Sequence, residues 1–216
     1  MAIKIYTDAS SNLFESILKE KNLDIQVLPM TVEIGDKSYL CYKDQIDVVE
    51  FSKTFYEKMK EGIRPKTSLP NPGLFQQSME KEISNGNKVL YISLAGGISG
   101  TFQTTSMIAN QINAKYKEEK VKVLNSKTAG LGEGMICMYA YQESLEENNL
   151  EKLFEGRGVY KEDKKRIHRR FPNLSDKQRK DFQNHSESNF TTFHQASSLR
   201  FRRRKNRIDK LGTWES

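Results

Sequence analysis

The residues best suited to chemistry form a turn rich in glycine and hydroxyl groups. The turn reads Ala-Gly-Gly-Ile-Ser-Gly-Thr over residues 95–101 and follows the apolar stretch 88–94. Glycine lets the backbone approach a ligand closely, and Ser99 and Thr101 supply hydroxyl groups. A helix beginning at Thr101 would add free backbone N–H groups and the positive end of its dipole. The turn, with Gly100 between its two hydroxyl residues, is therefore a candidate site for a phosphate or a carboxylate.

A second pair of hydroxyl residues, Thr67 and Ser68, precedes the proline-rich segment 69–73. Taken alone, this pair is most typical of turn and cap chemistry. The turn at 95–101 is not a P-loop, because no Gly-Lys-Ser/Thr sequence follows its glycines. A plain helix-capping turn would have a similar sequence, so both interpretations stay open at this point.

Acid–base catalysis has no obvious participants in the first 156 residues, which contain no histidine. Four carboxylates are expected on a solvated helix face: Asp44, Asp47, Glu50 and Glu57. Glu133, between Gly132 and Gly134, is expected to be exposed or locally paired. A hydroxyl-rich anion site without a base indicates binding and not turnover. An enzyme with an anionic small-molecule substrate is the weaker alternative.

The hydrophobic pattern of the first 156 residues alternates between strand and helix periodicities. Strands are expected at 2–7, 25–34, 38–42, 88–94 and 121–124. Helices are expected at 48–60, 101–116 and 128–147. One further helix is expected to begin near residue 12, and another, which follows the loop 66–73, is expected to end at about residue 84. This order predicts an α/β fold of three layers, with a mostly parallel sheet and helices on both of its faces. Ligands of such folds bind beyond the carboxyl ends of strands, here the loops 8–12, 95–101 and 125–128, with 67–73 as a further candidate.

The composition changes abruptly at about residue 157. Residues 1–156 carry 18 Lys and Arg against 21 Asp and Glu, whereas residues 157–216 carry 17 against 7. The hydrophobic periodicity also disappears there, and the polar tail is expected to be disordered or only locally helical. The sequence therefore predicts one α/β domain over 1–156, followed by an irregular basic tail over 157–216. The formal net charge of +7 comes from that tail.

Other features of the chain bear on its location and on metal binding. No apolar run approaches the roughly 18 residues of a membrane span. The first residues are expected to form a strand, with no basic region and apolar run of a signal peptide. Cys41 and Cys137 lie in no CxxC motif or Cys/His cluster, and reduced thiols are expected. The sequence thus predicts a cytoplasmic protein without a metal or a cofactor.

Five short motifs in one order carry a family resemblance. They are Ile5–Ser11, Pro29–Val32, Lys66–Gly73, Ile98–Gln103 and Asn125–Gly132. Together they resemble the DegV family of bacterial fatty-acid-binding proteins, over the whole N-terminal domain of that family. One departure is Ala9, which stands where the family usually has a serine after the first aspartate.

The resemblance implies a buried long-chain fatty acid whose carboxylate is held by the hydroxyl groups of Thr67 and Ser99. Ser68, Gly100 and Thr101 are secondary candidates beside them. It also implies that the protein presents the fatty acid to a fatty acid kinase, which phosphorylates the carboxylate, so that the binding protein is not the catalyst. In the family the acyl tunnel lies between two domains, and the second domain contributes Arg and His contacts.

Nothing of that second domain is present in the tail as written, which predicts weak or no fatty acid retention. A reading frame moved by one nucleotide can encode Phe-Thr-Val-Asp-Ser-Leu-Thr-Tyr-Leu over Ile167–Ser175. The same shift can encode Lys-Gly-Arg-Ile-Ser over Gln178–Phe182, and both peptides resemble second-domain motifs of the family at the family's spacing. The hypothesis is a frameshift between Glu155 and Arg166. The histidines of the tail, His168, His185 and His194, are then unrelated to ligand binding.

The competing hypothesis is a genuine basic arm. The segment Arg200–Arg207 would attract nucleic acid by releasing counterions from the phosphate backbone. The chain would then be a nucleic-acid-binding protein, which is the less favoured alternative.

Overall fold

The computed structural model describes residues 2–41 and 48–155 of the chain. A four-stranded sheet is formed by β1 (Ile3–Asp8), β2 (Ile25–Leu28), β6 (Lys88–Ser93) and β7 (Val121–Asn125). The strand order is β2-β1-β6-β7, and all three pairings are parallel. The run Val89–Ser93 is fully buried, as expected for a central strand that is covered on both faces.

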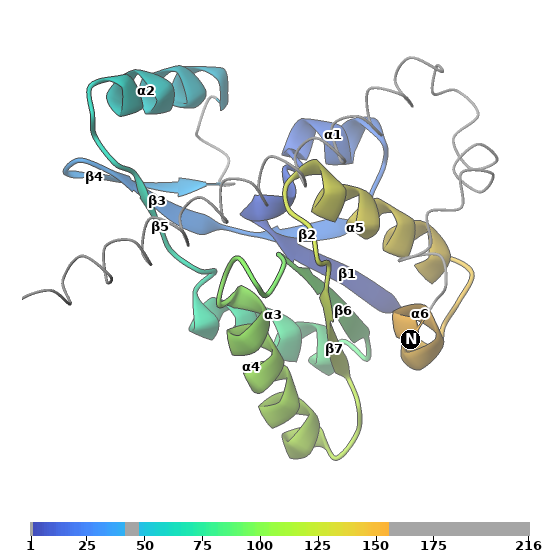
Figure 1. Cartoon of the computed structure of the whole chain (residues 1–216). Coiled ribbons are helices and arrows are strands. Elements are labelled where there is room, and N and C mark those ends of the chain that lie inside the picture. Colours follow the sequence, from blue (N-terminus) through green and yellow to red (C-terminus); the bar gives the residue numbers. More distant parts are fainter. Residues whose placement is uncertain (1, 42–47, 156–216) are drawn as a thin grey trace, which may run out of the picture. The chain divides into compact units, whose positions relative to one another are not determined.

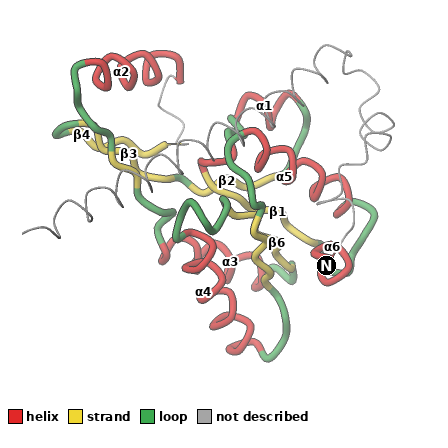
Figure 2. The backbone as a smooth tube through the Cα atoms, in the orientation of Figure 1, coloured by secondary structure: helices red, strands yellow, loops and turns green. Residues whose placement is uncertain are grey.

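Helices cover both faces of this sheet (Figures 1 and 2). Helix α1 (Glu15–Glu20), α5 (Leu131–Ser144) and α6 (Leu150–Glu155) pack on one face. Helix α3 (Pro72–Ser84) and α4 (Thr101–Tyr116) pack on the other face. The predicted α/β architecture is therefore confirmed.

Alternation along the strands divides the apolar side chains between two cores. Leu90 and Ile92 of β6 join the core that contains Cys137 of α5. Val89 and Tyr91 join the core that contains Phe75 of α3. Because successive side chains of a strand point to opposite faces, one strand sequence supplies both layers.

A second sheet is antiparallel and has the order β4-β3-β5. Its strands are β3 (Met30–Ile34), β4 (Lys37–Cys41) and β5 (Lys66–Thr67). Helix α2 (Val48–Lys60) contacts β4 through the rings of Phe51 and Tyr39, whose centroids lie 5.1 Å apart. The prediction of a single strand over 25–34 is wrong, because the segment divides at Pro29 between the two sheets. Proline has no N–H group to donate to a strand ladder, which favours a break there.

Two predicted helices begin later than the pattern indicated. Residues Ala9–Ser11 form a short 3-10 helix, η1, and α1 starts only at Glu15. Helix α5 starts at Leu131 and not at Thr128, because Gly130 has a φ of +58°, outside the helical region. The predicted surface carboxylates Asp44 and Asp47, together with the tail 157–216, lie outside the described residues.

Within the described ranges, no helix is long and apolar enough to cross a membrane. The same ranges contain no group of three or more His, Cys, Asp or Glu side chains that could hold a metal ion.

Candidate ligand-binding site

The hydroxyl groups of Ser99 and Thr101 meet at the N-terminus of α4. Ser99 Oγ lies 2.9 Å from Thr101 Oγ1, and it accepts a hydrogen bond of 3.2 Å from the Thr101 N–H. Thr101 is buried, Ser99 is half-buried, and Gly100 between them is exposed. Each of the two hydroxyl groups has one hydrogen atom to donate, and the hydrogen bond between them takes up one of the two. The other hydrogen can point to a ligand at the positive end of a 16-residue helix.

A network of loop contacts holds this turn in place. Asn125 Oδ1 accepts hydrogen bonds from the N–H groups of Gly96, at 3.2 Å, and Lys127, at 3.0 Å. The Ala95 N–H donates to the Thr128 carbonyl at 3.0 Å. The loops that follow β6 and β7 are thereby tied together at the carboxyl edge of the sheet. The site is preorganised, so little loop entropy remains to be lost when a ligand binds.

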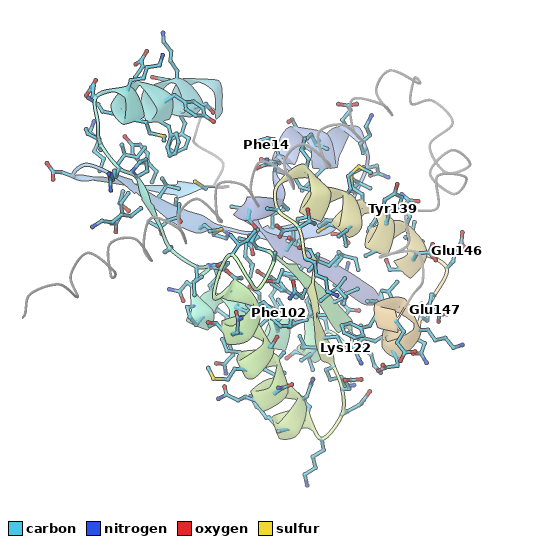
Figure 3. All side chains as sticks on the ribbon, in the orientation of Figure 1. Phe14, Phe102, Lys122, Tyr139, Glu146 and Glu147 are labelled. Carbon is cyan, nitrogen blue, oxygen red and sulfur yellow. The ribbon has the colours of Figure 1, made fainter. Side chains whose placement is uncertain are left out.

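Two neighbouring side chains closely approach Gly96. A Cβ atom at this position would lie 3.1 Å from the Phe102 ring and 3.1 Å from Asn125 Nδ2. Figure 3 labels Phe102 at the start of α4, next to the turn. The glycine that the sequence singled out for backbone access thus also lets the Phe102 ring pack against the loop.

Thr67 and Ser68 lie on the antiparallel sheet, at the end of β5. Thr67 pairs with Val32 of β3, and both hydroxyl residues are exposed. Ser68 is engaged with β3, because its N–H donates to the Thr31 carbonyl at 3.0 Å and its Oγ accepts from the Thr31 N–H at 3.2 Å. Ser99 and Thr101 are therefore brought together, whereas among the described residues no hydrogen bond joins this pair to Thr67 or Ser68.

A cluster of buried polar groups lies at the end of β1, and the sequence did not reveal it. Asp8 and Glu133 both have no exposed surface. Ser10 Oγ lies 2.5 Å from Asp8 Oδ1 and 2.8 Å from Glu133 Oε2, while Thr7 Oγ1 donates to Glu133 Oε1 at 3.1 Å. Tyr91 Oη donates to Asp8 Oδ2 at 2.7 Å. The prediction that Glu133 is exposed or locally paired is wrong, because Glu133 is buried and its partners Thr7 and Ser10 lie 126 and 123 positions away in the sequence.

Burial explains the unusual acid–base properties of this cluster. Loss of hydration raises the pKa of Glu133 to about 8, the negative charge of Asp8 adds to the rise, and the hydrogen-bonding contacts with Ser10 and Thr7 oppose it. Burial, followed by the charge of Asp8, also raises the pKa of Tyr91 well above its ordinary value. The one sequence feature that could have pointed here is Gly134, next to Glu133. A Cβ atom on Gly134 would lie 2.5 Å from the Ser11 carbonyl oxygen, so only glycine lets α5 approach η1 so closely.

These features define an α/β domain with a hydroxyl-lined turn at the carboxyl edge of a parallel sheet. The family profile described as "Uncharacterised protein, DegV family" matches residues 2–156. The chain belongs to the DegV family. Among its relatives, a DegV domain-containing protein of Clostridium perfringens is 29% identical over 150 residues, which cover 69% of this chain and 50% of the relative. One from Staphylococcus aureus is 32% identical over 130 residues, covering 60% of this chain and 42% of the relative.

Solved structures show the same fold. A fatty-acid-binding DegV family protein of Thermus thermophilus is 26% identical with a TM-score of 0.58, covering 72% of this chain and 51% of that one. A stearic-acid-binding protein of Eubacterium ventriosum is 18% identical with a TM-score of 0.60, covering 71% of this chain and 51% of that one. This chain spans about half the length of the relatives that it matches.

Proposed function

We propose that this domain holds the carboxylate end of a long-chain fatty acid, with Ser99 and Thr67 as its hydroxyl donors. The observation that carries the proposal is the Ser99–Thr101 hydroxyl pair at the N-terminus of α4. A carboxylate would accept charge-assisted hydrogen bonds there and gain from the helix dipole. Membership of a family in which a Thermus thermophilus relative binds fatty acid supports the same ligand. Ser68, Gly100 and Thr101 would line the site beside these donors.

The domain would act as a carrier and not as a catalyst. Within the described ranges there is no histidine, and the side chain of Glu133 has no exposed surface. Presentation of the fatty acid to a cytoplasmic fatty acid kinase is the role that we propose for it. The chain spans about half the length of the relatives that it matches, so the proposal concerns the carboxylate end of the ligand.

The experiment is a titration of the delipidated chain with a fatty acid that carries ¹³C at its carboxyl carbon. A shift of the ¹³C resonance should saturate in the wild-type protein as the fatty acid concentration rises. Ser99→Ala should weaken binding roughly tenfold to a hundredfold, which is the value of one charge-assisted hydrogen bond. Ser106→Ala, which removes a hydroxyl further along the same helix, is the matched control and should leave the affinity unchanged.

Two outcomes would overturn the proposal. Absence of any saturable shift in the wild-type chain would show that the domain holds no carboxylate by itself. Equal affinities of the Ser99→Ala protein and the wild-type protein would place the carboxylate elsewhere.

We also propose that residues 157–216 are a frameshifted reading of a second DegV domain. The change in charge balance at residue 157 and the two motifs recoverable over Ile167–Ser175 and Gln178–Phe182 support this proposal. Sequencing of the gene across codons 155–166 is the test. If the shifted frame does not continue as a second domain, the proposal fails and the tail has another origin.

A further inference from the structure

Two carboxyl groups are buried together where β1 meets α5. Asp8 is the last residue of β1, and Glu133 lies in the first turn of α5. The titratable groups that face Glu133 within the described part of the chain are Asp8, Tyr91 on β6, and Cys137 one helical turn along α5. All of them are acids, and no ion pair of the described residues includes Asp8 or Glu133. Two adjacent buried negative charges without a cation would be strongly unfavourable.

The position of Ser10 determines how many protons the pair holds. Its Oγ lies within hydrogen-bonding distance of both carboxyl groups, 2.5 Å from Asp8 Oδ1 and 2.8 Å from Glu133 Oε2. A serine hydroxyl has a single hydrogen to donate. If both carboxyl groups were ionised, one of these contacts would join two oxygen atoms with no hydrogen between them. One of the two carboxyl groups must therefore be protonated and donate to Ser10.

The remaining contacts assign the proton to Glu133. Asp8 accepts from the Ser10 N–H at 2.9 Å and from Tyr91 Oη at 2.7 Å, as a carboxylate does. Apart from its contact with Ser10, Glu133 accepts among the described residues one hydrogen bond, from the Thr7 hydroxyl to Oε1, so its Oε2 can carry the proton and donate it to Ser10. The raised pKa of Glu133, about 8, agrees with this assignment.

The contact between Ser10 and Glu133 joins the segment Ala9–Ser11 to helix α5 at the carboxyl edge of the parallel sheet. Residues Ala9–Ser11 follow β1, which lies beside β6 in the parallel sheet, so this loop and the Ser99 turn leave the same edge. The close approach of Gly134 to the Ser11 carbonyl shows how tightly α5 packs on the loop. A negative charge formed on Glu133 would act inside this packed junction.

We propose that Glu133 is a neutral carboxylic acid whose proton fastens the Ala9–Ser11 loop to α5, and that loss of this proton to solvent releases the loop. The released state has two carboxylates facing the single hydrogen of Ser10. Release therefore requires water to enter the junction and hydrate the new charge. In this proposal Glu133 positions the Ala9–Ser11 segment against α5. The proposal does not depend on which ligand the domain binds.

The proton gives stability a definite dependence on pH. The pKa of Glu133 is higher in the folded chain than its ordinary value of 4.5. The contribution of this group is thus fully present below about pH 4.5 and is lost as the pH rises to about 8. Across that window the ratio of folded to unfolded chain should fall about tenfold per pH unit relative to a chain with a neutral side chain at 133.

The experiment compares the full chain with its Glu133→Gln variant, whose amide reproduces the neutral acid by donating to Ser10 and accepting from Thr7. Urea unfolding is measured from about pH 5 to about pH 9, and hydrogen exchange of residues 9–12 is compared between the two proteins at each pH. The wild type should lose stability and loop protection relative to Glu133→Gln as the pH rises. Glu57→Gln, an exposed change on α2, should follow the wild type.

Parallel pH profiles of the wild type and Glu133→Gln would overturn the proposal. If Glu133→Gln does not fold, infrared spectroscopy of the wild type with ¹³C-labelled glutamate decides the matter. A protonated glutamate carbonyl band near neutral pH that disappears at alkaline pH supports the proposal. Absence of that band near neutral pH refutes it.

Discussion

Tyr91→Phe isolates a single buried hydrogen bond to a carboxylate. Tyr91 has no exposed surface, and its Oη donates to Asp8 Oδ2 at 2.7 Å. Its ring packs edge-on against Phe75, with centroids 5.0 Å apart. Phenylalanine keeps this ring contact and removes only the O–H group. The loss of stability therefore measures the hydrogen bond and not a cavity.

The expected magnitude follows from the charge of the acceptor and from burial. A hydrogen bond to a charged group contributes about 1.5–3 kcal/mol, so the free energy of unfolding should fall by about that amount. The matched control is Tyr6→Phe on the neighbouring strand, where Tyr6 Oη donates to Glu82 Oε1 at 2.9 Å. Glu82 is only partly buried and also accepts from Asn87 Nδ2 at 2.9 Å, so this loss should be about 1 kcal/mol or less.

Urea unfolding near neutral pH, followed by far-ultraviolet circular dichroism, is the assay. The two variants should share the m-value of the wild type and differ in the midpoint concentration of urea. Equal losses for Tyr91→Phe and Tyr6→Phe would refute the claim that burial strengthens the Asp8 contact. A loss below about 0.5 kcal/mol for Tyr91→Phe would refute the carboxylate assignment of Asp8.

Two further predictions concern the α5 junction and the tail. Gly134→Ala should lower the free energy of unfolding by about 1–3 kcal/mol despite a gain of about 1 kcal/mol in helix propensity, because the new Cβ would lie 2.5 Å from a backbone oxygen. Gly132→Ala on the same helix meets only the rotatable side chain of Thr128 and should lose less; a stabilised Gly134→Ala protein would contradict the packing. Removal of residues 157–216 should abolish any salt-dependent binding to DNA or RNA, measured by fluorescence anisotropy, and retained binding would exclude the basic arm as its cause.

Much of the parallel core could be predicted from hydrophobic periodicity. The buried run of β6 and the amphipathic pattern of α4 depend on local sequence, and both elements form close to where the pattern predicts them. The strand predicted over 25–34 was wrong because apolar alternation continues across Pro29, although the chain changes sheets there. Periodicity reports which face of a segment is buried, and it carries no information on the partner strand.

The hydroxyl turn was accessible from the sequence, because glycine spacing and a following helix are local features. Ser99 and Thr101 are two residues apart, and the turn between β6 and α4 is enough to bring their oxygen atoms to 2.9 Å. Thr67 can contact the proposed carboxylate only if the antiparallel sheet brings its hydroxyl group close to the Ser99 turn. The types of the residues do not determine that distance. The role of Thr67 therefore remains a prediction.

The surroundings of Glu133 were decided by the tertiary structure and not by the sequence near it. By itself, the sequence determined the order of strands and helices, the glycine and hydroxyl composition of the turn, and the membership of a family. The burial of Glu133 beside Asp8 arises from residues 125 positions apart that meet because α5 packs on the loop after β1. The sequence predicts that Glu133 is exposed or locally paired, whereas its burial beside Asp8 is the basis for our proposal that it keeps its proton, because the cost of burying a charge depends on the surroundings that the fold creates.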